Sequence, residues 1–594
     1  MKLCSPTSTS ALFFALSLAA CGGGTPGGDA AADRTAANFS VRSVSGAASV
    51  RSGDGPSDPL TPVSPAQPPG NTTSSPLTPA IAAHFLAQAT FGPTAAGISA
   101  LSASSKEDWI SSEFKKPQTL HRNYVQDAAS LLPAGTVLSP AEMYQTFWKQ
   151  AATGDDQLRQ RVTFALSQIF VISMIDDNLY TRAIGVASYY DMLGQFAFGN
   201  FRDLLQGVAL HPMMGIYLSH MRNQKESGSR VPDENFAREI MQLMTIGLYQ
   251  LNPDGSQKLQ NGRPVETYTH DDVAGLAKVF TGWSWAGPDQ SAPRFYGLSK
   301  DPARDWTPMQ NYPAYHSTST KSFLGTSVSG GSGEADLKAA LDTLFQHPNT
   351  GPFIGRLLIQ HLVSSNPSPA YVGRVAAAFA NNGSGVRGDM RAVLRAVLLD
   401  PEAADNGSPK KLREPILRLT HWMRAFNAKS TSGRFILPGM DDALNGLAQT
   451  PLRSPSVFNF FRPSYTPPNT SLSAQGLQAP EMQITGEPSV TGYLNFMQWV
   501  IPTGVGVNHD IKANYSAELA LAGQPPQLVD RINLLLLSGT MSTTLRNQIL
   551  GALNAVYMPV PSSSNAAQID AGRINRVYMA IYLTMASPEY LAQR

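Results

Sequence analysis

Two glutamates five residues apart, Glu234 and Glu239, have the types and spacing that most directly suggest chemistry. They lie in P-D-E-N-F-A-R-E-I-M-Q-L-M-T-I-G at residues 232–247. At helical periodicity the polar residues of this stretch fall within one arc of about 140°. If that face lines a cleft, two carboxylates with different pKa values can act as acid and base or nucleophile, as in glycoside cleavage. Arg238 would then assist catalysis, and Asn235 would contact the substrate.

The same polar face also has a structural explanation. Glu234 and Arg238 are spaced i,i+4, as are Arg238 and Gln242, so they can form a ladder of pairs on a solvated helix. Such pairs contribute about 0.3 kcal/mol each, which makes them a weak sign of function. The sequence leaves both explanations open.

The helix that would carry this face has clear boundary signals. Asp233 is a suitable N-cap after Pro232, and Glu234 places negative charge in the first turn, where the helix dipole favours it. Gly247 can end the segment in the left-handed conformation. We therefore predict a helix within residues 232–247.

Further polar candidates lie outside this segment. His316 and Lys321 fall in a loop-like region, where His316 could carry protons as a catalytic residue and Lys321 could bind substrate. A solvent-exposed loop histidine is the alternative. Arg161 and Asp191, on two other predicted helices, could also contact substrate, although buried ion pairs between helices explain them equally well.

A short aromatic stretch near residue 460 also stands out. Asn459, Arg462 and Tyr465 lie in F-N-F-F-R-P-S-Y, which predicts an anchored loop that acts as a lid or a partner surface.

Composition and missing motifs narrow the chemistry. The net charge is +2 and only 15% of the 594 residues are charged, so nothing predicts a nucleic-acid partner. The only cysteines are Cys4 and Cys21, which excludes thiolate chemistry in the rest of the chain. The sequence lacks H-E-x-x-H, the P-loop motif, an EF-hand loop and G-x-S-x-G. We expect no cofactor and no metal site.

The N-terminus predicts export and lipid attachment. Residues 1–20 combine Lys2 with a short apolar run and end in L-A-A before Cys21, and they resemble a bacterial lipoprotein signal peptide. Cys21 would be the lipid-attachment site, and Gly22 resembles the second residue of lipoproteins sorted to an outer membrane. Residues 21–76 are rich in Gly, Ser, Thr and Pro, which predicts a disordered tether. We expect a lipid-anchored cell-envelope protein at an outer membrane. The sequence favours neither the periplasmic nor the surface face of that membrane.

The remaining residues, 77–594, predict a mainly α-helical protein with long irregular loops. We expect one large helical domain, for which two lobes are an alternative arrangement. Long loops are predicted at 251–267, 286–322 and 463–492. The principal helices are predicted at 79–89, 139–152, 158–174, 187–197, 200–210, 212–221, 270–282, 335–346, 355–363, 369–380, 389–399, 412–426 and 573–585.

Several ordered segments carry a family resemblance. The segments are A-H-F-L-A-Q-A-T-F-G-P-T at 83–94, Y-Y-D-M-L at 189–193, F-G-N-F-R-D-L-L at 198–205, L-H-P-M-M-G-I-Y-L at 210–218, P-D-E-N-F-A-R-E at 232–239 and F-T-G-W at 280–283. Together they resemble the bacterial family known as domain of unknown function 1800. The resemblance implies an exported protein that accompanies a sulfatase-like secreted partner, and it implies no established activity.

This chain departs from the family pattern at one place. Many members have E-L-H-T-L-G where this chain has Q-L-M-T-I-G, so Gln242 and Met244 replace a carboxylate and a histidine. A metal site built on these two positions is therefore not expected.

Three functional hypotheses remain. The first is a lipid-anchored binding or assembly module for an exported partner or a surface polymer. The second is a polysaccharide hydrolase or lyase that uses Glu234 and Glu239, assisted by His316 or Arg238. The third is a metal-dependent enzyme that uses His316 with Glu239.

Overall fold

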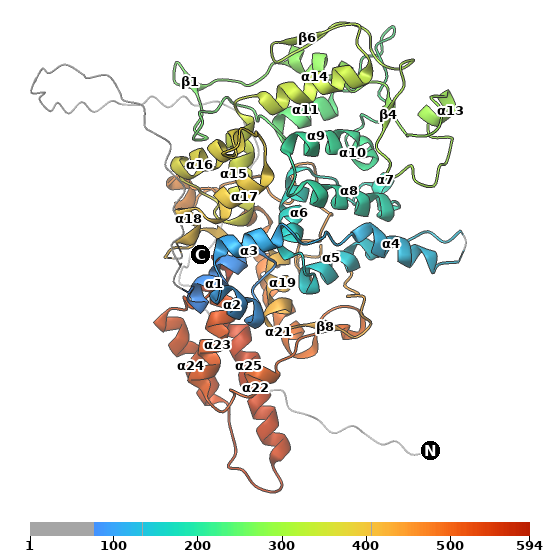
Figure 1. The fold of residues 1–594 in the computed structure, drawn as a ribbon. Helices are drawn as coiled ribbons and strands as arrows, with labels where there is room; N and C mark the ends of the chain where they lie inside the picture. The colour runs from blue at the N-terminus through green and yellow to red at the C-terminus, as the bar shows by residue number, and fades with distance from the viewer. Residues whose placement is uncertain (1–75, 134, 406) are drawn as a thin grey trace, which may run out of the picture. The chain divides into compact units, whose positions relative to one another are not determined.

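The structure is a computed structural model, and it describes residues 76–133, 135–405 and 407–594. In this part of the chain helices dominate and strands occur only as short pairs (Figure 1). The predicted mainly α-helical fold is confirmed. The predicted signal peptide, Cys21 and nearly all of the predicted tether at 21–76 lie outside the described residues.

Eleven helices lie between residues 79 and 242 of the described chain. They are α1 (Pro79–Ala89), α2 (Ala95–Ser102), α3 (Lys106–Glu113), α4 (His121–Ser130), α5 (Ala141–Thr153), α6 (Gln157–Ile169), α7 (Asp177–Tyr180), α8 (Ala183–Phe196), α9 (Phe201–Leu210), α10 (Pro212–Tyr217) and α11 (Asn235–Gln242).

Helices also dominate the described chain after residue 242. They are α12 (His270–Val279), α13 (Ala292–Phe295), α14 (Gly333–Gln346), α15 (Thr350–Leu362), α16 (Pro369–Ala380), α17 (Met390–Leu398), α18 (Pro401–Ala404), α19 (Pro415–Ala425), α20 (Ser471–Ala474), α21 (Glu487–Thr503), α22 (Ser516–Leu519), α23 (Pro525–Leu537), α24 (Thr543–Ala555), α25 (Ala566–Ala586) and α26 (Pro588–Leu591), with the 3-10 helices η1 (Pro480–Ile484) and η2 (Val507–His509).

The described strands form five antiparallel pairs. The pairs are β1 (Leu259–Gln260) with β2 (Arg263–Pro264), β3 (Trp283–Ser284) with β4 (Gln310–Asn311), β5 (Lys321–Phe323) with β6 (Thr326–Val328), β7 (Lys411–Leu412) with β10 (Ala592–Gln593), and β8 (Lys429–Ser430) with β9 (Ile511–Lys512). All three predicted long loops contain short regular elements, which periodicity cannot detect in segments of two to five residues. The predicted end of the third loop, at residue 492, is wrong, because the 17-residue helix α21 begins at Glu487.

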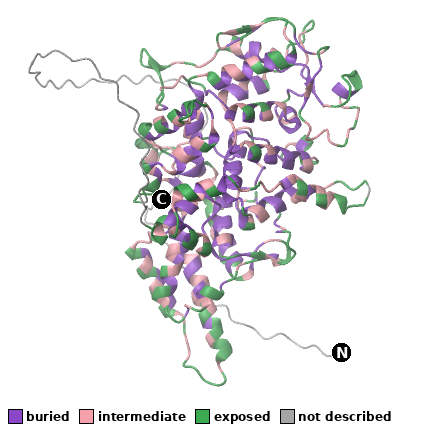
Figure 2. Cartoon of the chain, viewed as in Figure 1, coloured by how far each residue is buried: buried purple, intermediate pink, exposed green. Residues whose placement is uncertain are grey.

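Helix α6 is the most deeply buried element near the site described below. Every residue of α6 is buried, although it includes Arg159, Gln160, Arg161 and Gln168 (Figure 2). The helix packs against α1, α3, α5, α8 and α15. Buried polar side chains require hydrogen-bond partners within the protein, so α6 must be surrounded by other polar groups.

Helix α11 is shorter than the predicted segment 232–247. It begins at Asn235, although Asp233 Oδ1 still accepts a hydrogen bond from the Asn235 backbone N–H at 2.9 Å. It ends at Gln242 because later N–H groups no longer donate to the carbonyl four residues earlier. Met244 donates to the Glu239 carbonyl, and Gly247 donates to the Met241 carbonyl at 3.0 Å. Gly247 has a φ of +71°, as its predicted left-handed role requires.

The described helices include none that combines the length and the apolar character needed to cross a bilayer.

Candidate functional site

A cleft in the described part of the chain has a volume of about 750 Å³. Its walls come from the C-terminal ends of α6 and α11, from α15, and from loops that follow α11 and α19. Clefts of this size hold small molecules or a short polymer segment. The residues around it are Gln168, Ile169, Gln242, Leu243, Gly247, Leu248, Tyr249, Leu251, Gly255, Ser256, Gln257, Phe353, Arg356, Leu357, Gln360, His361, Val457, Phe458, Asn459, Phe461, Arg462, Pro463, Ser464 and Gln478.

The cleft lining combines three kinds of side chain. Aromatic rings are supplied by Tyr249, Phe353, Phe458 and Phe461. Amides and hydroxyls belong to the same lining, so donors and acceptors are present together with flat apolar surfaces. The ionised groups are two arginines, and no carboxylate belongs to the lining.

One glutamine organises the polar rim. Gln478 Oε1 accepts hydrogen bonds from Gln360 Nε2 at 3.0 Å and from Arg356 Nη2 at 3.3 Å. The Gln478 backbone is held in turn by Asn366, which donates to its carbonyl at 2.8 Å and accepts from its N–H at 2.8 Å. Gln360 also donates to the Pro463 carbonyl at 3.2 Å. Helix α15 and the 463–478 loop are thereby fixed to each other across the cleft rim.

A buried polar cluster adjoins the cleft, and we define it as Arg161, Gln168, Lys411, Glu414 and Glu481. Each of these residues is buried, and Gln168 also lines the cleft. Its charges balance, with two cations and two carboxylates. The cluster joins α6, β7, the residue before α19, and η1.

The contacts join the members in two pairs, and Arg161 and Lys411 both donate to the His361 carbonyl. Lys411 Nζ lies 3.0 Å from Glu481 Oε1. Gln168 Nε2 donates to Glu414 Oε2 at 2.7 Å, and Gln449 donates to the same oxygen at 2.9 Å. Several buried atoms have no partner within the described protein: Arg161 Nε and Nη1, Gln168 Oε1, Glu414 Oε1 and Glu481 Oε2.

Burial and the charges of the cluster shift the pKa values of two members and of the neighbouring His361. Burial raises the pKa of Glu481, and Glu414 raises it further, while Lys411 acts in the opposite direction. Burial lowers the pKa of Arg161 to about 10, although Glu414 opposes the shift. Burial, with added repulsion from Lys411 and Arg161, lowers the pKa of His361 well below its usual value, so this cleft histidine is neutral at pH 7.

The polar face of α11 is divided between solvent and protein. Glu234 Oε2 pairs with Arg238 Nη2 at 3.0 Å, and both side chains are partly exposed. Asn235 is exposed and donates to Ser219 Oγ at 3.4 Å. Glu239 is buried, its Oε2 atom has no partner, and burial raises its pKa against the effect of Arg238.

Of the residues on this face, Gln242 reaches the cleft. It accepts a hydrogen bond from the Tyr268 hydroxyl at 3.2 Å. Neither Glu234 nor Glu239 belongs to the cleft lining.

His316 and Lys321 are brought together, in a buried position, by Asp336. Asp336 Oδ2 lies 2.9 Å from His316 Nε2 and 2.8 Å from Lys321 Nζ. His316 Nδ1 faces the Thr281 carbonyl at 2.8 Å, and Lys321 donates to the Ser317 carbonyl at 2.6 Å. In the described chain no hydrogen bond or ion pair joins His316 to either candidate glutamate. The alternative prediction, that His316 is a solvent-exposed loop histidine, is wrong, because its side chain is buried.

Asp191 and Arg161 lie in separate environments. Asp191 accepts hydrogen bonds from the backbone N–H groups of His121 at 2.8 Å and Arg122 at 2.9 Å, at the start of α4. This carboxylate therefore holds the N-terminus of a helix. Arg161 belongs to the buried polar cluster and is not part of the cleft lining.

Sequence reasoning missed most of this site. Arg356, Gln360 and Gln478 were not predicted, and neither were Lys411, Glu414 and Glu481 of the buried cluster. The available signal was the presence of amides and charges inside otherwise apolar helical patterns, such as R-L-L-I-Q-H-L-V at 356–363. Asn459 and Arg462, predicted to form an anchored loop, do line the cleft.

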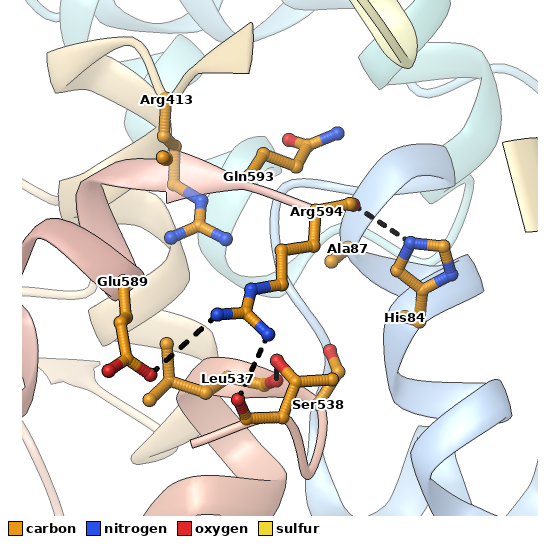
Figure 3. A pocket seen from close by; sticks show the side chains of 10 residues that line it. His84, Ala87, Arg413, Leu537, Ser538, Glu589, Gln593 and Arg594 are labelled. Atoms are coloured by element: carbon orange, nitrogen blue, oxygen red, sulfur yellow. Dashed lines mark hydrogen bonds and ion pairs between the residues drawn. The ribbon is translucent and has the colours of Figure 1, made fainter. Parts of the chain in front are cut away.

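A much smaller void lies at the C-terminal end of the chain (Figure 3). His84 Nε2 lies 2.8 Å from the Arg594 carbonyl, and Arg594 Nη1 donates to the Thr540 carbonyl at 3.2 Å. The void measures about 20 Å³, space for about one water molecule. We interpret it as an anchoring point for the terminus.

The described residues contain no group of three or more His, Cys, Asp or Glu side chains placed to hold a metal ion.

Fold and cleft together define the class: a mainly helical protein with a ligand-sized cleft whose lining lacks acidic groups. The chain belongs to the family described as "Protein of unknown function (DUF1800)", which it matches over residues 84–592. No curated protein and no solved structure shows a significant match to it.

Proposed function

We propose that this protein is a cell-envelope binding module that holds a surface polysaccharide in the 750 Å³ cleft. The composition of the cleft lining is the observation that carries the proposal. Sugar rings present apolar C–H faces and hydroxyl edges, which match aromatic rings flanked by amides and hydroxyls. The rim is held in place before any ligand arrives, since Gln360 and Gln478 are fixed by the contacts described above.

The location of the module follows from its N-terminus. We propose that residues 1–20 direct export, that Cys21 carries the lipid, and that residues 21–76 tether the helical part to the envelope, with an outer membrane as the destination. A tether of this kind would allow the cleft to reach a polymer beyond the membrane surface.

Binding by a lining aromatic residue offers a direct test. The chain beginning at Gly22 would be titrated with a panel of neutral and charged polysaccharides by calorimetry. Tyr249 is 38% exposed in the cleft wall, so Tyr249→Ala should leave the core intact while weakening binding. The loss should be about 1 kcal/mol, or roughly fivefold in Kd.

Tyr557→Ala is the matched control, because Tyr557 is 81% exposed and lies outside the cleft lining. Equal affinity of the two variants, or no binding of any polysaccharide by the parent chain, would contradict the proposal.

Cleavage of the bound polymer is the second candidate function. The observation in its favour is the contrast between two glutamates at α11: Glu239, within the helix, is buried with a raised pKa, and Glu234, the residue before the helix, is partly exposed beside Arg238. Such a contrast can divide acid and base roles between two carboxylates. We favour binding over cleavage because neither glutamate lines the cleft.

Reducing-end release from the same panel tests cleavage. Glu234→Gln/Glu239→Gln should abolish the release, whereas Glu334→Gln, at an exposed position of α14, should not. Activity absent from the parent chain, or equal in the double variant, would exclude this candidate.

A further inference from the structure

We infer that the cleft selects an anionic polysaccharide, sulfated or carboxylated, through Arg356 and Arg462. This inference rests on the proposed binding function and specifies the class of its ligand. Arginine guanidinium groups bind carboxylates and sulfates through charge-assisted hydrogen bonds that are stronger than neutral ones.

The charge of the cleft is uncompensated. Arg356 and Arg462 line it without a carboxylate or a lysine among the other lining residues. Neither arginine forms a salt bridge within the described chain. Asp254, which precedes the lining residue Gly255, is already engaged by the Ser256 backbone at 2.9 Å and hydroxyl at 2.6 Å.

Arg356 is partly removed from water without a countercharge. Burial lowers its pKa, and no neighbouring charge offsets that effect. Its Nη2 atom donates to Gln478 Oε1, which leaves other N–H donors of the guanidinium available. A partly desolvated cation of this kind is unfavourable until an anion approaches it.

Arg462 belongs to the 457–464 loop segment of the lining, and two contacts orient it. Its guanidinium carbon lies 5.1 Å from the centroid of the Phe458 ring, a distance suited to a cation–π contact. Its backbone N–H donates to Gln483 Oε1 at 2.8 Å, which anchors the loop that carries it. The cleft lining therefore contains one cation on α15 and one on the 457–464 loop, and both can contact an anionic polymer.

The nearby histidine adds no charge to this pair at neutral pH. His361 is kept neutral by burial and by the adjacent cations Lys411 and Arg161. Glu414 and Glu481 face the same region from the buried cluster, where Gln168 and Lys411 respectively engage them. The positive potential available to a ligand thus comes from the two arginines.

Polymers that share a backbone and differ in charge test the inference. The chain beginning at Gly22 would be titrated with dextran, carboxymethyl-dextran and dextran sulfate, and with the corresponding cellulose series. We expect the parent chain to bind at least one charged polymer about tenfold more tightly than its neutral backbone, a difference of about 1.4 kcal/mol. The carboxymethyl and sulfate arms distinguish the two sources of negative charge.

Arg356→Gln/Arg462→Gln should bring the ratio of charged-polymer to neutral-polymer affinity close to one, whatever the change in neutral-polymer affinity itself. Arg573→Gln is the matched control for net charge, because Arg573 is about half exposed on α25 and outside the cleft lining. Thermal melting would establish that the variants fold.

The outcomes separate the two proposals. Equal affinity for neutral and charged polymers, or an equal loss in Arg573→Gln, would overturn the anionic preference and leave polysaccharide binding intact. Failure of every polymer, neutral ones included, would overturn both.

Discussion

Replacing Lys411 by methionine should destabilise the protein far more than replacing an exposed lysine. Lys411 Nζ pairs with Glu481 at 3.0 Å and donates to the carbonyls of Gln360 at 2.8 Å and His361 at 3.1 Å. Lys411→Met leaves the Glu481 carboxylate buried without its cation. Unpaired buried charges cost about 3–5 kcal/mol, so we expect a loss of that size in the free energy of unfolding at pH 7.

The variant should recover part of this loss at low pH. Burial raises the pKa of Glu481 above its usual value of 4.5, so the folded state binds this proton more readily than the unfolded chain does. Ionised Glu481 therefore opposes folding above its raised pKa, and protonation removes that penalty as the pH falls below it. Without Lys411 the pKa rises further, so the difference between variant and parent should narrow on acidification.

Urea unfolding followed by circular dichroism measures these free energies. The control is Lys338→Met, because Lys338 is 75% exposed and pairs with Asp342 at 2.5 Å on the surface, where a pair contributes about 0–1 kcal/mol. The double variant Lys411→Met/Glu481→Leu removes both charges and should recover most of the loss, with a smaller remaining cost because the Gln360 carbonyl loses its donor. A Lys411→Met variant no less stable than Lys338→Met would refute the reasoning.

Two further predictions follow from other parts of the chain. Cys21→Ser should move the protein from the detergent phase to the aqueous phase in a Triton X-114 partition, whereas Cys4→Ser should not; retention of Cys21→Ser in the detergent phase would contradict lipid attachment. Asp336→Asn should lower the free energy of unfolding by about 3 kcal/mol, since it leaves Lys321 buried without its carboxylate. A shift in the urea midpoint no larger than that of Asp342→Asn, at a partly exposed position, would count against it.

Local signals predicted the helices well where their ends are set by nearby residues. Helices α1 and α16 have the predicted bounds, because Thr78 and Ser368 cap them and a proline follows each cap. Helix α11 is shorter than predicted because residues after Gln242 bond to the Glu239 and Met241 carbonyls, an arrangement that periodicity does not register.

The candidate site was less predictable because its parts are far apart in the sequence. Gln242 and Asn459 were both noted from the sequence, yet nothing local to either places them around one cleft. Lys411 and Glu414 lie close together in the chain, but their partners Glu481 and Gln168 come from distant segments. Long-range packing determines which residues meet at such a site, and local sequence patterns do not specify that packing.

The buried cations explain why the cluster and the cleft depend on each other. Gln360 and His361 lie in the last turn of α15, where helix carbonyls lack partners within the helix. Lys411 donates to both carbonyls, and Arg161 Nη2 donates to that of His361 at 2.6 Å. Cations are favoured at this end of a helix, so they cap α15. Because the side chains of the two capped residues form part of the cleft wall, the cluster holds the wall in position as well as stabilising the fold.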